Sequence, residues 1–121
     1  MKAILLVGHG SRAKEAKEVF IKVSRELSNR IDKKVYIAFM ENANPSIEDA
    51  FLKMKEEGIE EVDVLPYFLF EGIHIKEDIP DILRNMKDEF DIEIVFKRPI
   101  EYHSLIVDIL IDRLKGEGIC I

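Results

Sequence analysis

Three histidines, at positions 9, 74 and 103, are the side chains best suited to bind a metal ion or move a proton near neutral pH. His9 lies between Gly8 and Gly10, directly after an apolar run at positions 3–7. The two glycines permit positive φ angles and leave space around the imidazole. The amides at the start of a following helix would point at the same place. We therefore interpret His9 as a metal ligand or proton acceptor, in preference to a capping or turn histidine.

His74 follows a second apolar stretch and lies between Ile73 and Ile75. Taken alone it could be a core residue; a position beside His9 would favour a ligand. Two neutral imidazoles suit Co²⁺, Ni²⁺, Fe²⁺ or Zn²⁺, and two protein ligands leave coordination positions open for a substrate. His103 precedes the last apolar segment, where it is interpreted as a capping or supporting residue.

Hydrophobic periodicity predicts four strands that alternate with four helices. Ser11 is the predicted N-cap of the first helix, and Ser46 with Asp49 resembles an N-cap pair for the second. Gly58 ends the second helix, and Pro80 is placed early in the third. The predicted strands cover 3–7, 35–40, 62–68 and 92–96, and the helices cover about 13–30, 47–57, a segment containing 79–86, and 105–114.

Alternating strands and helices with short connections predict an α/β fold, a single domain over residues 1–121. The expected parallel sheet has the order 2-1-3-4, with helices on both faces. In this order the first and third strands are neighbours. The loops that carry His9 and His74 would then leave the same edge of the sheet side by side, facing one crevice.

The composition limits the classes of function. The formal charge of −6 and the absence of a separate basic cluster argue against a nucleic-acid partner. Apolar runs fall short of the roughly 18–20 residues that cross a membrane, and no signal-peptide pattern is present, so we expect a cytoplasmic protein without membrane partners. Cys120 is the single cysteine and cannot form a disulfide within one chain; an unreactive thiol is the simplest interpretation.

The segment 65–70 is more aromatic than a buried strand requires, and its last residues run into the following loop. It could hold a flat apolar ligand, form a subunit interface in a two-fold dimer, or be ordinary core. Glu41 and Glu71 lie on loops at the same predicted edge. Each could assist as an acid or base, or be a solvated loop carboxylate.

A longer motif follows each of the first three predicted strands. The motifs are Gly8-His9-Gly10-Ser11-Arg12, then Glu41 with Asn44-Pro45-Ser46, then Pro66-Tyr67-Phe68-Leu69-Phe70-Glu71-Gly72-Ile73-His74. At this spacing they resemble the small, single-domain sirohydrochlorin cobaltochelatases of archaea, members of the class II chelatases. The similarity extends over essentially the whole chain.

The resemblance implies a chelatase, a lyase that inserts a divalent metal ion into sirohydrochlorin without ATP and releases two protons. It implies a four-stranded chelatase domain that pairs as a symmetric homodimer, with no permanently bound cofactor. His9 and His74 are carried over as the catalytic and metal-binding residues, with His9 as the proton acceptor. Co²⁺ or Ni²⁺ is the expected metal substrate, because small relatives in methanogens also serve the nickel tetrapyrrole of methanogenesis. Larger relatives carry a histidine-rich tract, which this chain lacks.

The resemblance also places two loops around the tetrapyrrole, at 41–46 and 69–74. Ser11, Arg12 and helix amides could donate hydrogen bonds to the substrate's carboxylates. The apolar loop could press on the ring and expose its nitrogens. The expected substrate-binding residues are Ser11, Arg12, Glu41, Asn44, Pro45, Leu69, Phe70, Glu71, Gly72 and Ile73.

Two other functions remain open from the residues alone. One is phosphoryl transfer through a phosphohistidine at His9, although no arginine stands directly before that residue. The other is a carrier that binds a metal or tetrapyrrole without turnover.

Overall fold

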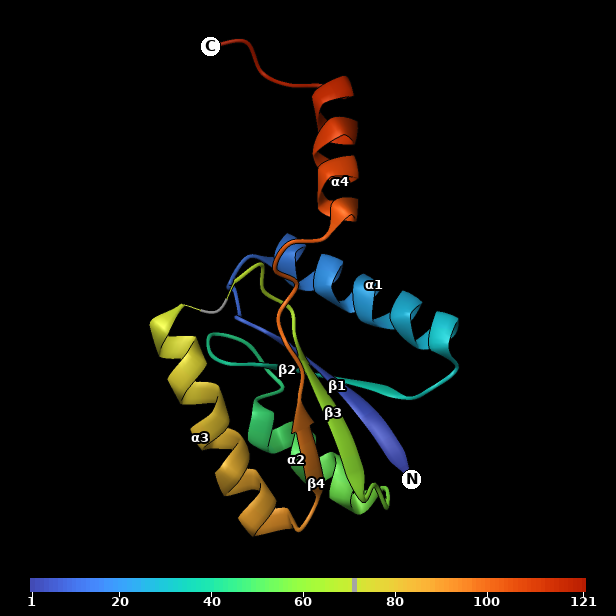
Figure 1. The fold of residues 1–121 in the computed structure, drawn as a ribbon, viewed down its shortest axis with the longest axis vertical. Coiled ribbons are helices and arrows are strands. Elements are labelled where there is room, and N and C mark those ends of the chain that lie inside the picture. The colour runs from blue at the N-terminus through green and yellow to red at the C-terminus, as the bar shows by residue number, and fades with distance from the viewer. Residues whose placement is uncertain (71) are drawn as a thin grey trace.

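The computed structural model describes residues 1–70 and 72–121, with the side chains of residues 73–75 outside the description (Figure 1). Strands and helices alternate along the chain, as the periodicity predicts. The elements are β1 (Lys2–Gly8), α1 (Lys14–Ile31), β2 (Val35–Phe39), α2 (Ile47–Glu56), β3 (Glu61–Pro66), α3 (Ile73–Phe90), β4 (Glu93–Phe96) and α4 (Ser104–Lys115).

The four strands form one parallel sheet in the order β2-β1-β3-β4, which confirms the predicted topology. In the register, Gly8 at the end of β1 pairs with Phe39 of β2, and Val7 pairs with Pro66 of β3. The residues that follow β1, β2 and β3 therefore emerge at one edge of the sheet. This carboxyl edge is where the histidine loops were expected.

Two hydrophobic clusters cover the two faces of the sheet. The larger one joins α2 and α3 to one face through buried side chains such as Phe51, Ile79 and Leu83. The smaller one joins α1 to the other face, where Phe20 packs with Leu6 and Phe39. Helices thus lie on both faces, as predicted.

The last helix, α4, departs from this layered arrangement. It projects away from the domain beyond the carboxyl edge (Figure 1), and none of its residues is buried. No helix in the described ranges is long and apolar enough to span a membrane.

The predicted helix caps were half right. Ser46 accepts a hydrogen bond from the Asp49 amide, and the Asp49 carboxylate accepts one from the Ser46 amide, so the N-cap pair of α2 is confirmed. Ser11 as the N-cap of α1 is wrong. Its Oγ accepts from the Ala13 amide at 3.0 Å and forms a local turn, and the N-cap position is Ala13, without a side-chain cap. The Ser11 hydroxyl thus forms a short local turn and does not cap the helix.

The boundaries around β3 and α3 also differ from prediction. β3 ends at Pro66, two residues early, and α3 begins at Ile73. The Lys76 amide donates to the Gly72 carbonyl at 3.0 Å and closes the first helical turn. His74 therefore lies in that turn and not in a loop before the helix, and Pro80 lies about two turns inside α3. The β-branched residues around His74 disfavour helix and obscured this start.

Candidate functional site

His9 and Glu41 meet at the carboxyl edge of the sheet. His9 Nε2 lies 3.2 Å from Glu41 Oε1, and the two side chains are 56% and 58% exposed. The backbone brings them together: the Met40 amide donates to the Gly8 carbonyl, and the Glu41 amide donates to the His9 carbonyl. These bonds continue the β1–β2 pairing past the last strand residues. A histidine and a carboxylate that sequence analysis left as separate candidates thus form one pair.

Gly10 allows this approach of the two loops. It has a φ of +106°, a region that side-chain-bearing residues rarely adopt, and its Cα faces the Glu41 backbone. Gly8 packs against the ring of Phe20. The glycines on both sides of His9 therefore serve close packing as well as backbone freedom.

A cavity of about 210 Å³ opens beside His9. Its wall is aromatic: the Phe20 ring centroid lies 4.9 Å from that of Phe39 and 5.6 Å from that of Tyr67. Phe68 makes an edge-on contact with the His9 ring at 6.1 Å. The lining residues are Gly8, His9, Gly10, Ser11, Ala16, Lys17, Phe20, Phe39 and Tyr67.

Lys17 is a lining residue that sequence analysis missed. It lies on α1 one turn before Phe20, and its Nζ is 5.8 Å from the centre of the Phe39 ring. The spacing of Lys17 and Phe20, three residues apart on one helix, was the available signal, because such residues share a helix face. Ser11 lines the same cavity, and Arg12 is exposed beside it.

The loop after β2 runs along the site. Asn44 is exposed and Pro45 half-buried, and the Pro45 carbonyl accepts a hydrogen bond from the Phe39 amide at 2.9 Å. This bond folds the loop back onto the end of β2. The expected contact residues of this loop therefore stay near Glu41.

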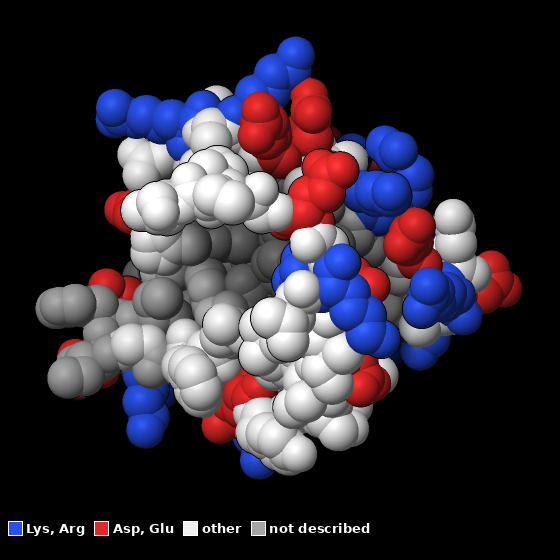
Figure 2. Space-filling model, turned by 90° about the horizontal axis from the view of Figure 1, so that it is seen from above, with Lys and Arg blue, Asp and Glu red and all other residues white. Residues whose placement is uncertain are grey.

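The loop after β3 presents apolar side chains to solvent. Leu69 is 56% exposed and Phe70 70% exposed, and Gly72 is the N-cap of α3. Glu71 and the side chains of Ile73 and His74 lie outside the described residues. The backbone places His74 in the first turn of α3, at the same edge of the sheet as His9. Seen from the α4 end, this face carries a broad uncharged area with a hollow, and charged side chains gather mostly around it (Figure 2).

His103 is separate from this pair. Its Nδ1 accepts a hydrogen bond from the Leu105 amide at 3.1 Å and caps α4, as the capping interpretation predicted. Cys120 is exposed near the C-terminus. Within the side chains that the structure describes, no group of three histidine, cysteine or acidic residues converges as a metal site.

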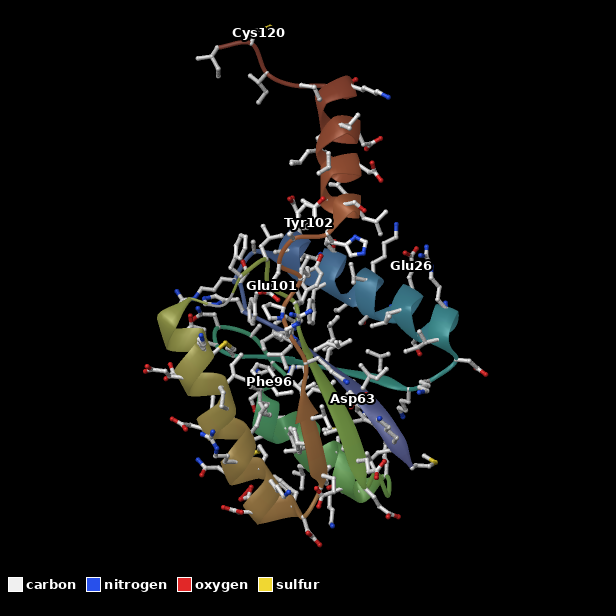
Figure 3. The ribbon with its side chains drawn as sticks, in the orientation of Figure 1. Glu26, Asp63, Phe96, Glu101, Tyr102 and Cys120 are labelled. Carbon is white, nitrogen blue, oxygen red and sulfur yellow. The ribbon has the colours of Figure 1, made fainter. Side chains whose placement is uncertain are left out.

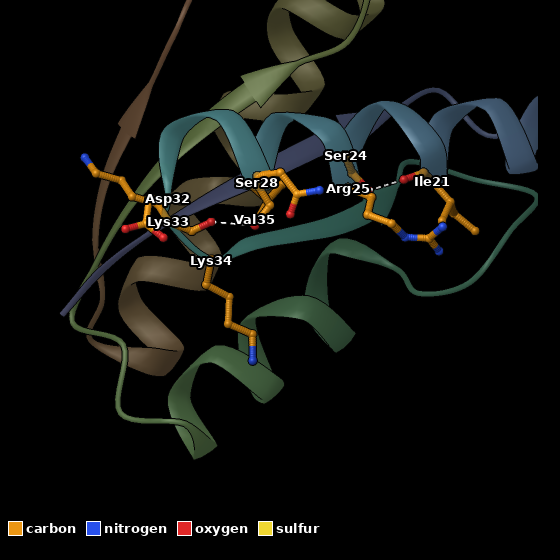
Figure 4. Close-up of a pocket in the computed structure, with 9 residues that line it drawn as sticks. Ile21, Ser24, Arg25, Ser28, Asp32, Lys33, Lys34 and Val35 are labelled. Atoms are coloured by element: carbon orange, nitrogen blue, oxygen red, sulfur yellow. Dashed lines mark hydrogen bonds between the residues drawn. The ribbon is translucent and has the colours of Figure 1, made fainter.

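A larger cavity, about 670 Å³, lies at the opposite edge, between the end of α1 and the start of β2 (Figure 4). Its polar lining includes Arg25, Lys33 and Lys34, and two serine hydroxyls there donate to backbone carbonyls. It contains no histidine and no aromatic side chain. Size alone therefore does not identify the functional site, and the smaller cavity beside His9 has the relevant chemistry.

Two pKa shifts arise where β2 meets the end of α2. Burial and a hydrogen bond to Glu57 raise the pKa of Tyr36, and the same hydrogen bond, with one from Lys34, lowers the pKa of Glu57. This cluster joins the start of β2 to the end of α2. It is a structural contact between these two elements.

Comparison with known proteins adds independent information. The CbiX family model matches residues 3–117. A sirohydrochlorin cobaltochelatase from Methanocaldococcus jannaschii is 34% identical, with 96% of this chain and 99% of the relative covered. One from Sulfolobus acidocaldarius is 36% identical, with 91% and 87% covered. A sirohydrochlorin ferrochelatase from Priestia megaterium is 30% identical over 98% of this chain but only 46% of its own length.

Solved structures repeat this pattern. A cobalamin-biosynthesis CbiX protein from Marinobacter aquaeolei matches with a TM-score of 0.82 and 29% identity, covering 95% of each chain. The sirohydrochlorin chelatase SirB from Bacillus subtilis, solved in complex with cobalt, matches with a TM-score of 0.87 and 29% identity. That match covers 94% of this chain and 50% of the SirB chain.

Proposed function

Because the chain belongs to the CbiX family, we propose that it is a sirohydrochlorin chelatase, which inserts a divalent metal ion into the macrocycle without ATP and releases two protons. Curated relatives of similar length carry the name sirohydrochlorin cobaltochelatase. The observation that carries the proposal is the His9–Glu41 pair beside an aromatic cavity. Phosphoryl transfer through His9 is not favoured by this family assignment.

His9 is the residue that contacts the metal and accepts a proton. Its imidazole is more than half exposed, so an arriving ion can reach it. Metal insertion requires the loss of water from the ion and of two N–H protons from the macrocycle. A neutral imidazole can supply a ligand nitrogen and later hold a proton. His74, in the first turn of α3, is the second metal ligand in this proposal.

Glu41 assists His9. With its carboxylate 3.2 Å from Nε2, Glu41 can accept a hydrogen bond from a protonated His9 and stabilise the imidazolium. It also offers a place for the second proton, since a carboxylate at an exposed edge exchanges protons readily with water. Loss of the Glu41 carboxylate would slow proton removal more than it would lower the stability of the fold.

The macrocycle lies against the aromatic wall and the two loops. Phe68 and the exposed Leu69 and Phe70 supply apolar surface, while Ser11 and Arg12 supply donors for carboxylates. In this proposal the loop at 41–46 and the segment at 71–73 also contact the macrocycle. Pressure from these side chains could bend the ring and expose its nitrogens.

Two copies of the chain form the working enzyme. The described cavity, about 210 Å³, is below the roughly 300–1,000 Å³ of ordinary ligand pockets, so one chain encloses only part of a macrocycle. The match to SirB covers half of that longer chain, which leaves room there for a second domain of this size. A homodimer supplies the corresponding second domain here.

Co²⁺ is the first metal to test, and Ni²⁺ the second. Relatives of this chain are named for cobalt or for iron. Two histidines with open coordination positions accept several borderline divalent ions and do not select one by geometry. The metal supply of the cell would then decide which product forms.

The proposal is tested by anaerobic incubation of the full chain with sirohydrochlorin and Co²⁺, Ni²⁺ or Fe²⁺, followed by absorption spectroscopy. We expect enzyme-dependent metalation with repeated turnover, lost in His9→Ala and retained in His103→Asn, which preserves a capping side chain. Stoichiometric binding without turnover would instead indicate a carrier. Failure to accelerate metalation with every metal would exclude the chelatase function.

A further inference from the structure

The His9 imidazole is exposed, although a metal ligand works only when its nitrogen is held in place. The His9 side chain is 56% exposed, and its partner Glu41 is 58% exposed on the loop after β2. An exposed side chain changes rotamer freely, on a timescale of picoseconds to nanoseconds. An exposed pair of this kind contributes little free energy, so Glu41 alone does not fix the imidazole. A second contact is needed to hold the ring in one orientation.

Phe68 provides this second contact. Its ring meets the His9 imidazole nearly at a right angle, with 81° between the planes and 6.1 Å between the centroids. Aromatic rings attract one another in this edge-to-face arrangement, because the positive edge of one ring meets the negative face of the other. Glu41 engages one nitrogen, Nε2, whereas Phe68 engages the ring itself. Together the two contacts restrict both the position of the nitrogen and the tilt of the ring plane.

Phe68 is itself held in place. Its side chain is half-buried and packs against the larger hydrophobic cluster, on the face of the sheet that α2 and α3 cover. The amide of the preceding residue, Tyr67, donates to the Val7 carbonyl at 2.8 Å, which ties this part of the chain to the end of β1. The Phe68 carbonyl accepts a hydrogen bond from the Ile100 amide at 2.9 Å, in the linker between β4 and α4. The core and two backbone bonds therefore anchor this ring.

The linker makes a second bond to the same loop. The Glu101 amide donates to the Leu69 carbonyl at 2.7 Å, and Figure 3 shows Glu101 in the linker, between β4 and the base of α4. Phe70 follows these bonded residues, and its side chain is 70% exposed. Two phenylalanines of one loop thus differ, because Phe68 is anchored in the domain and Phe70 faces solvent.

We propose that Phe68 is a positioning residue for His9, and that its anchored ring holds the imidazole in the orientation that receives the metal ion and the proton. The direction of an imidazole lone pair follows the orientation of the ring, so a freely turning ring would offer its nitrogen for only part of the time. Phe68 thus does more than add apolar surface for the macrocycle. This inference rests on the proposed function and deepens it, since it assigns the residue that prepares His9.

Phe68→Leu tests the kinetic consequence, because leucine keeps an apolar side chain and removes the ring. We expect kcat for metalation to fall about 2–10-fold, the factor that corresponds to the loss of one aromatic contact, with little change in the KM for sirohydrochlorin. Phe68→Tyr keeps the ring and should retain kcat. Phe70→Leu, the matched control, makes the same change on the exposed part of the loop, and it should raise KM without lowering kcat.

Two kinetic results would overturn the proposal. One is an unchanged kcat in Phe68→Leu, whether or not KM rises, because a residue that only touches the macrocycle behaves in this way. The other is an equal loss of kcat in Phe68→Tyr, since the aromatic ring would then not be the feature that matters. Thermal melting of each variant shows whether the fold is retained.

Nuclear magnetic resonance of the native chain, without metal or macrocycle, tests the contact itself. The imidazole signals of His9 are assigned by comparison with His9→Ala. We expect nuclear Overhauser contacts between the His9 and Phe68 rings, and a more mobile imidazole on the picosecond-to-nanosecond timescale in Phe68→Leu.

Absence of these contacts in the native chain would overturn the proposal, and this result can be obtained even if Phe68→Leu does not fold. Equal mobility of the imidazole in the native chain and in folded Phe68→Leu would also overturn it. Because neither measurement needs metalation, they separate a failure of the positioning role from a failure of the chelatase function.

Discussion

A Cβ atom placed on Gly10 would stand 1.7 Å from the carbonyl oxygen of Glu41, so the two loops pack backbone to backbone. Gly10→Ala must therefore push these loops apart and separate His9 from Glu41. We expect metalation to fall at least tenfold. We also expect the free energy of unfolding, from urea titration, to fall by more than the roughly 1–2 kcal/mol cost of a left-handed backbone alone.

Gly58→Ala is the matched control for Gly10→Ala. Gly58 also has a positive φ, +79°, but a Cβ there meets open space. Gly58→Ala should lose about 1–2 kcal/mol of stability and keep its metalation rate. Equal effects of the two substitutions would contradict the close-packing argument.

Glu41→Gln should slow metalation while leaving the fold intact. The substitution keeps the size of the side chain but removes the carboxylate beside His9, and both side chains are exposed enough that folding does not depend on the pair. Removal of a partner of a metal-binding histidine typically reduces affinity or activity about 10–100-fold. Steady-state metalation and thermal melting measure the two effects. Glu89→Gln, on exposed α3 surface, should change neither, and an unchanged rate in Glu41→Gln would remove Glu41 from the mechanism.

Lys17→Ala should weaken substrate binding. Lys17 lines the cavity beside His9 and offers a cation to a carboxylate of the macrocycle. We expect a several-fold rise in KM with little change in kcat, because a contact to a carboxylate of the macrocycle binds the ground state and the transition state equally. Lys14→Ala, which removes an 89% exposed lysine one turn earlier, should leave KM unchanged. A similar rise in both variants would indicate a general effect of charge.

The sheet order could be predicted because short connections and right-handed crossovers leave few arrangements for four alternating units. The cap formed by Ser46 and Asp49 was predictable because it is local. Ser11 shows the limit of such reasoning. A serine before a helix can accept a hydrogen bond from the first turn of the helix or from the amide two residues on, and the sequence does not show which bond forms.

The position of the site at the carboxyl edge of the sheet could be predicted, but the pairing of His9 with Glu41 could not. Glu41 and Glu71 were equal candidates, since each follows a strand. The register of β1 on β2, with Gly8 opposite Phe39, brings Glu41 beside His9, and Glu71 lies outside the described residues. The apolar pattern of a strand shows which face each side chain takes, but it does not by itself show which residues of two strands lie opposite each other.

The packing of α4 was beyond the reach of the sequence for a different reason. Hydrophobic periodicity identifies an apolar helix, but it does not give the direction in which the preceding linker carries that helix. The Ile100 and Glu101 amides bond to the carbonyls of Phe68 and Leu69 and hold the linker along the loop after β3, and these are tertiary contacts.

Ser46→Ala should lower the free energy of unfolding by about 1 kcal/mol, because the Asp49 amide loses its side-chain acceptor at the start of α2. Urea titration measures this loss. Ser46→Asp, which keeps an acceptor, should retain most of the stability. Equal losses in the two variants would show that the cap contributes little.

Tyr36→Phe should change how stability depends on pH. The Tyr36 hydroxyl donates to Glu57, and burial, with this bond, raises the pKa of Tyr36 above its ordinary value of 10.0. The stabilisation that protonated Tyr36 gives to the folded state is therefore complete below pH 10, and it is lost as the pH rises toward the folded-state pKa. The same bond lowers the pKa of Glu57 below 4.5, so the contribution of Glu57 is present above that pH and is lost as the pH falls further.

The native chain should consequently be more stable than Tyr36→Phe between about pH 5 and 10, and the difference should shrink on both sides of that range. Urea titrations at pH 3.5, 7 and 11 measure the difference directly. Tyr102→Phe, at a residue 81% exposed, should match the native chain throughout. A difference that stays constant across these pH values would mean that Tyr36→Phe alters packing alone, and that the Tyr36–Glu57 bond does not link α2 to β2 energetically.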